Sequence, residues 1–407
     1  MVNGSPQVPV GSAGDGVGED FDPLAPETFD SPYETYRDLR ARCPVAHSSA
    51  YGGFWALTRH ADVDAAARNP DLFISSVKAV VPSDPRGIRR PPLNFDAPAH
   101  TPFRKALERT LERDRLAAME PRLREHAVRE LEPLLRAGSG DISRQFGTTY
   151  PAFVAAEWLN LRETQVYELA ATASVWVDAW RRLDPETVTA KSNEMYAMAR
   201  ELVAERKRSP RDPTEDPASS LLAVEHEGAH LDEELIVGAL RQSLVVGLVA
   251  PPLIIGAIAV HLSRHPELHT QLRRQPELVP AALEEFLRLY TPYRGFSRTV
   301  SEDFDIHGRT IVPGEPVTLV YASANRDDEV FSDPDTFVLS RPNIGRHLAF
   351  GAGSHRCLGM SLARLSLRIA VAELIARTVR IELVGEIEPT RMPELGPQCV
   401  PVALFTE

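Results

Sequence analysis

Cys357 is the residue of this sequence whose surroundings most clearly indicate chemistry. It lies in the segment FGAGSHRCLG, residues 350–359, and a helix is predicted to begin directly afterwards. The amide groups and dipole at the start of a helix stabilise a thiolate. Gly351 and Gly353 before the cysteine and Gly359 after it permit positive φ angles and the close approach of a flat ligand. The segment therefore predicts an anionic sulfur beside a flat site.

The other two cysteines, Cys43 and Cys399, lack this setting. A lone cysteine is usually a small buried hydrophobic residue, and we expect that role for both. For Cys357 the flanking pattern favours a metal ligand, because an anionic sulfur donates electron density to a haem iron and promotes O–O cleavage. The three cysteines lie far apart, which argues against a disulfide framework and favours a reducing cytoplasm.

The segment around Cys357 resembles the cysteine loop of the cytochrome P450 family, Phe-Gly-x-Gly-x-His-x-Cys-x-Gly. Its six fixed positions are matched by Phe350, Gly351, Gly353, His355, Cys357 and Gly359. The stretches PYETYRDLRARCPV and FWALTRHADV are similar to the family's opening helix and strand, so the resemblance begins near Asp22. It implies a mainly α-helical fold with small β-sheets, a triangular prism of helices around a buried haem b.

The resemblance implies four partners for the two haem propionates, which need cationic or hydrogen-bonding groups. His100 and Arg104, in DAPAHTPFR, are four residues apart and can reach one edge of a ligand. Arg298 in FSRTV and His355 in the cysteine loop complete the set. Without the family context, a surface His–Arg pair explains the first two residues equally well.

The resemblance also implies a structural ion pair between Glu285 and Arg288, in the segment EEFLRL. A spacing of three places both side chains on one face of a helix. In the family, an Arg or Asn of the segment that follows completes this pair. On the residues alone, a solvated surface pair has the same spacing.

One segment departs from the family pattern. The family's long central helix carries an acid followed by an alcohol, which relay protons to dioxygen, and the matching segment here is VGLVAPP. Gly247 is retained, but Val249 and Ala250 occupy the acid and alcohol positions, and neither can carry a proton. The two prolines that follow cannot donate to the carbonyls of Gly247 and Leu248, so we expect a kink there and free carbonyls that hold water in place of the alcohol.

The expected activity is that of a monooxygenase that uses O2 and electrons from an external ferredoxin and its NAD(P)H-dependent reductase. The VGLVAPP segment is similar to that of P450 enzymes that attack thiocarbamates, ethers and small aromatics, which favours hydroxylation or oxidative O-dealkylation of a small hydrophobic compound. Because Val249 and Ala250 replace the proton relay, a peroxide-using peroxygenase is the alternative. A haem protein with an atypical biosynthetic or sensing role is the third hypothesis.

The resemblance places the substrate pocket along the loop from Val77 to Pro92 and at several residues further on. These residues are Val246, Val249, Ala250, Tyr293, Phe296 and Cys399. The set is largely apolar, as expected for a hydrophobic substrate. Trp176 and Trp180, one helical turn apart, either cover this pocket or pack in the ordinary way between helices.

Basic residues on the cysteine side could bind an acidic redox protein, for which a ferredoxin is the expected partner. They are Arg104, Lys105, Arg109, Arg113, Arg346, Arg356, Arg364 and Arg368. A solvated charged helix face explains the first four equally well. The net charge of −12 argues against non-specific binding to nucleic acid.

The 407 residues predict one haem domain over residues 22–407, without a fused reductase, after a flexible Gly- and Pro-rich tail at residues 1–21. A monomer in the cytoplasm is expected, and no signal peptide is recognised. The apolar stretch from Leu244 to Leu262 is long enough to span a bilayer, but two prolines and a histidine within it favour a buried central helix.

The pattern of apolar and charged residues predicts helices over residues 32–42, 61–68, 101–136, 150–208, 231–289 and 361–377. Strands are predicted at residues 52–58 and in a β-rich region that follows the helix at residue 289, with turns at Gly308 and Gly314. The segments 75–98 and 209–217 are predicted to be loops, because their prolines interrupt any helix.

Overall fold

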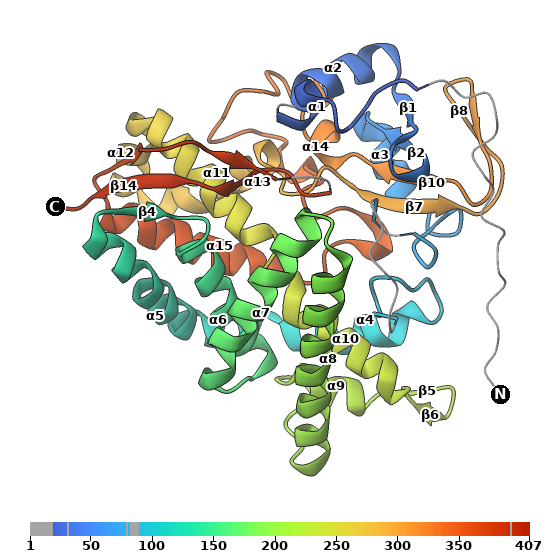
Figure 1. Cartoon of the computed structure of the whole chain (residues 1–407), viewed down its shortest axis with the longest axis horizontal. Helices are drawn as coiled ribbons and strands as arrows, with labels where there is room; N and C mark the ends of the chain where they lie inside the picture. The colour runs from blue at the N-terminus through green and yellow to red at the C-terminus, as the bar shows by residue number, and fades with distance from the viewer. Residues whose placement is uncertain (1–18, 31, 79, 82–88, 391–392) are drawn as a thin grey trace.

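Helices account for most of the computed structural model, which describes residues 19–30, 32–78, 80–81, 89–390 and 393–407 (Figure 1). The α-helices are α1 (Pro26–Asp30), α2 (Pro32–Arg42), α3 (His60–Ala67), α4 (His100–Glu108), α5 (Arg113–Ala137), α6 (Phe146–Leu159), α7 (Glu163–Arg181), α8 (Pro185–Arg208), α9 (Pro217–Leu222), α10 (Glu233–Val246), α11 (Ala250–Arg264), α12 (Pro266–Arg274), α13 (Val279–Leu289), α14 (Tyr321–Ala324) and α15 (Met360–Arg377). Short 3-10 helices occur at η1 (Ala50–Gly52), η2 (Arg109–Leu111), η3 (Pro276–Leu278), η4 (Ile344–Arg346) and η5 (Gly353–His355).

The strands form small sheets at the edge of the helical body. They are β1 (Val45–Ser48), β2 (Phe54–Leu57), β3 (Phe73–Ile74), β4 (Ser139–Asp141), β5 (Glu225–His226), β6 (Ala229–His230), β7 (Phe296–Val300), β8 (Phe304–Ile306), β9 (Arg309–Ile311), β10 (Pro316–Leu319), β11 (Arg380–Leu383), β12 (Glu388–Pro389), β13 (Pro397–Cys399) and β14 (Pro401–Phe405). The largest sheet has the order β1-β2-β10-β7-β3, and a second sheet pairs β11, β14 and β4. Strands from the two ends of the sequence therefore lie side by side (Figure 1).

The short predicted elements are found with small differences in their ends, whereas the helical stretches predicted over residues 101–136, 150–208 and 231–289 are each divided into several helices. The prediction for residues 32–42 agrees with α2, and the predicted turns at Gly308 and Gly314 have φ angles of 75° and 91°. The segment predicted as a loop over residues 209–217 ends one residue earlier, because Pro217 opens α9 with Asp216 as its cap. Proline is tolerated at the start of a helix, where its missing N–H would have had no partner.

The central helix is interrupted at the place where the sequence predicted a kink. α10 ends at Val246, a turn occupies residues 247–249, and α11 begins at Ala250. Pro251 and Pro252 thus lie in the first turn of α11, where no N–H is required. The break packs closely against α6, since an alanine Cβ at Gly147 would lie 3.0 Å from Cα of Pro252.

The apolar run that could span a membrane lies within this central pair of helices. Residues Glu233–Arg264 have the length and hydropathy of a spanning helix, and 67% of their most apolar window is buried inside the protein. Ile254, Ile258 and Leu262 of α11 belong to the main hydrophobic core. This burial favours the buried central helix expected from the sequence.

Two expectations fall partly outside the described residues. Residues 1–18 of the predicted tail lie outside them, as do residues 79 and 82–88 of the predicted pocket loop. The described remainder of the 75–98 segment has no helix or strand, as predicted.

Candidate active site

The cysteine loop has a backbone conformation that its glycines make possible. Gly351 and Gly353 have φ angles of 66° and 67°, and the amide of Cys357 donates a 2.8 Å hydrogen bond to the carbonyl of Phe350. A Cβ at position 353 would collide with the carbonyl oxygen of Ala67 at the end of α3. The loop is therefore closed on itself and packed tightly against the neighbouring helix.

Cys357 lies at the wall of an enclosed space. Its side chain is exposed, yet burial raises the pKa of its thiol more than the Gly359 amide and the Arg104 guanidinium lower it. A group that is accessible and at the same time surrounded by protein faces an internal cavity rather than the outer surface. The expected stabilisation of a thiolate by the helix start is thus outweighed by desolvation, and a bound metal cation would supply the difference.

A buried carboxylate braces the segment that leads into the cysteine loop. Glu285 accepts from Arg288 at 2.7 and 2.8 Å and from Arg341 at 3.0 Å. Both guanidinium groups also donate to backbone carbonyls of residues 325–336, which joins α13 to this segment. The Glu285–Arg288 pair is therefore internal, not a solvated surface pair, and Arg341 is the third member that the family pattern implied.

Two further contacts, which sequence reasoning missed, tie the loop to α13. Asn325 is fully buried and bridges Thr291 to the backbone amide of Leu348. Glu284 accepts from His347 at 2.9 Å and from Arg364 at 2.7 Å. Burial raises the pKa of Glu284, but these two hydrogen bonds outweigh it and hold the pKa at about 2. The Arg364 guanidinium also lies 4.8 Å from the centre of the Phe350 ring.

The four residues expected at the propionates gather around one point. The rings of His100 and His355 are 4.6 Å apart, and Arg104 donates at 2.7 Å to the carbonyl of Arg356. Burial lowers the pKa of His355, and the charges of Arg298 and Arg104 lower it further. Nε2 of His100 is buried and has no hydrogen-bond partner. An anionic ligand would satisfy this unused nitrogen and the surplus of positive charge.

Asp96 is a member of this cluster that the sequence did not single out. It accepts from the backbone amides of Ser75 and Ser76, each at 2.9 Å, and lies 3.5 Å from Nε2 of His355. Its only signal in the sequence is an acid four residues before His100. It fixes the His355 ring from the side of the 75–98 segment.

Most of the residues expected in the substrate pocket lie either at the α10–α11 break or in the Tyr293–Phe296 pair. Val246 is 49% exposed and a Cβ at Gly247 would meet nothing within 4 Å, so the end of α10 borders open space. Val249 is buried and Ala250 half-buried in the break that follows. Tyr293 and Phe296 pack ring to ring at 4.9 Å.

Cys399 does not fit the expected apolar lining. Burial and the carboxylate of Asp141 raise the pKa of its thiol to about 11, so the side chain lies beside a charged group. Cys43 and Cys399 are also half-buried instead of fully buried, and Cys43 accepts a hydrogen bond from Arg309. Trp176 and Trp180 stack on each other at 5.9 Å within the main core, as ordinary helix packing predicts.

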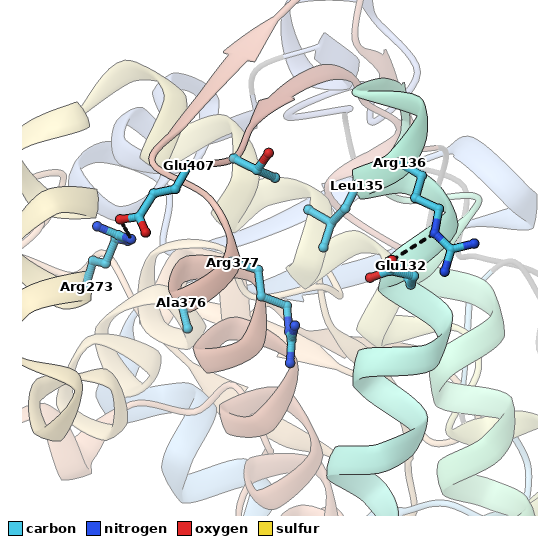
Figure 2. Close-up of a pocket in the computed structure, with 8 residues that line it drawn as sticks. Glu132, Leu135, Arg136, Arg273, Ala376, Arg377 and Glu407 are labelled. Atoms are coloured by element: carbon cyan, nitrogen blue, oxygen red, sulfur yellow. Dashed lines mark hydrogen bonds and ion pairs between the residues drawn. The ribbon is translucent and has the colours of Figure 1, made fainter.

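A hollow on the outer surface is separate from this site. It is lined by charged ends of α5, α12 and α15 and by the terminal residue, among them Arg136, Arg273 and Arg377 (Figure 2). Arg377 is the last residue of α15, whereas Cys357 directly precedes its first turn. The length of this helix separates the hollow from Cys357 by roughly 25 Å, at about 1.5 Å per residue.

The cavity that Cys357 faces fits an iron porphyrin. Cys357 would supply the sulfur that binds the iron, and His100, Arg104, Arg298 and His355 would bind the propionates. An alanine Cβ at Gly359 would meet nothing within 4 Å, which leaves room for a flat ring over the start of α15.

Known proteins share this arrangement. The model of the family "Cytochrome P450" matches residues 257–390. The chain is 31% identical over 369 residues to linalool 8-monooxygenase of Pseudomonas putida, covering 86% of this chain and 90% of that protein. It is 33% identical over 368 residues to vitamin D(3) 25-hydroxylase of Pseudonocardia autotrophica, covering 88% and 89%.

A solved structure, the cytochrome P450 CYP109Q5 from Chondromyces apiculatus, superposes with a TM-score of 0.84 at 28% identity, over 94% of this chain and 97% of that one. The fold and the cysteine site thus define a haem-thiolate oxidoreductase. The chain belongs to the cytochrome P450 family, whose members are monooxygenases with haem b as cofactor.

Proposed function

We propose that this P450 uses O2 to hydroxylate or O-dealkylate a small hydrophobic substrate, with electrons from a ferredoxin and its NAD(P)H-dependent reductase. The observation that carries the proposal is the enclosed space that Cys357 faces, with apolar residues of the α10–α11 break and the Tyr293–Phe296 pair nearby. Apolar cavities with few polar groups bind hydrophobic ligands. When bound, haem activates dioxygen, and its thiolate ligand promotes O–O cleavage.

The relatives support a hydrocarbon-rich substrate. One is named for the oxidation of linalool and the other for the hydroxylation of vitamin D(3), and both names describe attack on largely apolar molecules. The roles proposed for this chain's residues follow from the geometry. His100, Arg104, Arg298 and His355 hold the cofactor by its propionates, while Val246 and Val249 exclude bulk water and contact the substrate.

An exposed basic surface near the cysteine supports an acidic electron donor. Lys105, Arg109, Arg113, Arg346 and Arg356 are exposed. Arg104, Arg364 and Arg368 are half-buried and already paired with Glu108, Glu284 and Glu120. The first group is therefore the part of the surface that can bind a ferredoxin, and we propose that the enzyme acts as a monomer in the cytoplasm.

A peroxide-using peroxygenase is the second candidate. It is favoured by the break itself, because Val249 and Ala250 offer no proton relay and Pro251 and Pro252 continue the apolar surface. In that reaction the peroxide supplies both the oxygen atom and the electrons, so neither a proton relay nor a redox partner is required.

The test has two stages. The reduced protein under carbon monoxide should show the red-shifted Soret band of a thiolate-ligated haem, and Cys357→Ser should abolish it. Turnover of substrate candidates is then measured with ferredoxin, reductase and NADH, and separately with hydrogen peroxide. Faster and better-coupled turnover with ferredoxin supports the first proposal, whereas turnover with peroxide alone supports the second. Absence of the band in the unaltered protein would contradict both.

A further inference from the structure

A buried ion pair with unused hydrogen-bonding atoms lies beside this space. Arg181 ends α7, and Glu394 precedes β13; their side chains are 10% and 4% exposed. Nε of Arg181 is 3.8 Å from Oε2 of Glu394, too far for a hydrogen bond, and neither atom has any other partner. Unsatisfied polar atoms are rare in protein interiors, and each one calls for an explanation.

The pair lies close to Cys357. Tyr293 forms an isolated β-bridge with Glu394. Burial raises the pKa of Tyr293, and the charges of Glu394 and Cys357 raise it further, while Arg181 opposes them. The Tyr293 hydroxyl is therefore within electrostatic reach of both the ion pair and the cysteine sulfur.

The same segment also contacts the start of α11. An alanine Cβ at Gly396 would lie 3.3 Å from Cβ of Leu253, in the first turn after the break. The Glu394 segment therefore joins Tyr293, the start of α11 and the ion pair in one region of the protein. Arg181 comes to it from α7, and Glu394 from the segment that precedes β13.

Two other buried ion pairs among the described residues have all their buried side-chain atoms in hydrogen bonds. Arg206 and Asp216, between α8 and α9, are almost fully buried and lie 2.9 Å apart. Asp216 accepts a further bond from the Ser219 amide, and Arg206 donates to the carbonyl of Asn160. Glu285 is similarly saturated by Arg288 and Arg341. The open geometry of Arg181 and Glu394 differs from this pattern.

We propose that Arg181 and Glu394 bind a hydroxyl group of the substrate. A hydroxyl oxygen can lie about 2.8 Å from both atoms at once, accepting from Nε and donating to Oε2. Nε of Arg181 donates and Oε2 of Glu394 accepts, so the pair selects a neutral group that both accepts and donates. A hydrocarbon would leave both atoms unsatisfied, and a carboxylate would face Glu394.

This inference rests on the proposed function and narrows its substrate class to hydrophobic alcohols. Because Tyr293 is in electrostatic reach of both the pair and Cys357, a substrate anchored at the pair would present one of its other carbons toward the sulfur. The reaction converts that C–H bond to C–OH, with O2, two electrons and two protons consumed and one water released. The expected product is a diol.

The test is a spectral titration of the haem-loaded enzyme with three sets of matched compounds. The sets are adamantane, 1-adamantanol and 1-adamantanecarboxylate; tert-butylcyclohexane, its 4-hydroxy and its 4-carboxylate derivatives; and butylbenzene, 4-phenylbutan-1-ol and 4-phenylbutanoate. The alcohol of at least one set should bind about tenfold more tightly than its hydrocarbon. This ratio is what two charge-assisted hydrogen bonds contribute after the cost of desolvating the hydroxyl group is subtracted. The ratio of these two dissociation constants is the quantity of interest.

Variants separate binding from structure. Arg181→Met and Glu394→Gln should bring the alcohol-to-hydrocarbon ratio close to one. Arg206→Met, which breaks the saturated pair between α8 and α9, is the matched control and should lower the melting temperature without changing the ratio. If a variant fails to take up haem, the ratio of the hydrocarbon and alcohol dissociation constants of the unaltered enzyme still tests the hydroxyl anchor.

Three outcomes would overturn the inference. Equal binding of hydrocarbon and alcohol in every set would exclude a hydroxyl anchor while leaving the proposed function intact. Tighter binding of a carboxylate would show an anion site instead. If no compound of any kind moved the Soret band of an enzyme with a normal carbon monoxide spectrum, the proposed substrate class would itself be wrong.

Discussion

The two sides of the haem cavity are built differently. On the cysteine side, Glu285, Glu284 and Asn325 accept or donate hydrogen bonds in several directions and hold one loop in place. On the side that we propose for the substrate, the α10–α11 break presents apolar residues, and Arg181 and Glu394 retain unused polar atoms. The comparison teaches that the rigid side fixes the cofactor, whereas the side with unsatisfied atoms is open to a ligand.

The largest effect is expected from removing the brace on the cysteine side. Glu285→Ala leaves the guanidinium groups of Arg288 and Arg341 buried without their carboxylate, which should cost about 3–5 kcal/mol of folding free energy. Haem content and the carbon monoxide band should then be lost. Glu277→Ala, an exposed glutamate on the neighbouring η3, is the control. Normal haem content in Glu285→Ala would show that the hydrogen-bonded cysteine side is not what fixes the cofactor.

A smaller effect is expected from acid. The pKa of Glu284 is about 2 in the folded protein, against 4.5 for an unperturbed glutamate, because its hydrogen bonds to His347 and Arg364 outweigh burial. A lowered folded-state pKa stabilises the protein above pH 4.5, and this stability is lost as the pH falls toward 2. The loss is at most about 3 kcal/mol. The melting temperature should therefore fall less steeply between pH 6 and 3 in Glu284→Gln than in the unaltered protein. Parallel curves of melting temperature against pH would contradict this.

The smallest effect is expected on the substrate side. Pro252→Ala restores an N–H that can bond the carbonyl of Leu248, which we propose helps to hold the water for proton delivery. The fraction of electrons recovered in product should fall by up to about fivefold, equivalent to one hydrogen bond of about 1 kcal/mol, with haem content unchanged. Pro266→Ala, in the first turn of α12, is the control. Unchanged coupling and rate would remove the proposed role of the break.

The features that the sequence predicted are those with local signals. Gly351 and Gly353 predict a loop with positive φ angles, and Pro251 and Pro252 predict an interruption of the central helix. The Glu285–Arg288 spacing is visible because both residues lie on one helix. The length of the interruption was not predicted, since a proline pair permits either a bent helix or a new helix start; the structure has a turn over residues 247–249.

The features that were missed join segments far apart in the sequence. Arg181 and Glu394 are separated by most of the C-terminal half, and neither residue has a neighbourhood in the sequence that points to the other. Glu284 looks like any charged residue on a helix until His347 and Arg364 are placed beside it. Cys399 was assigned to the pocket by resemblance to the family, but the side-chain direction in its short strand depends on how that strand pairs.

The contact between Gly147 and Pro252 has a consequence for how the cavity can change in evolution or by design. An alanine at 147 would require Pro252 to move by a few tenths of an ångström, because its Cβ would lie 3.0 Å from the proline Cα. The start of α11 would shift with it, away from α6. Gly147 of α6 thus limits the position of α11, and with it the size of the cavity that we propose for the cofactor and substrate, although it lies in the next layer of helices.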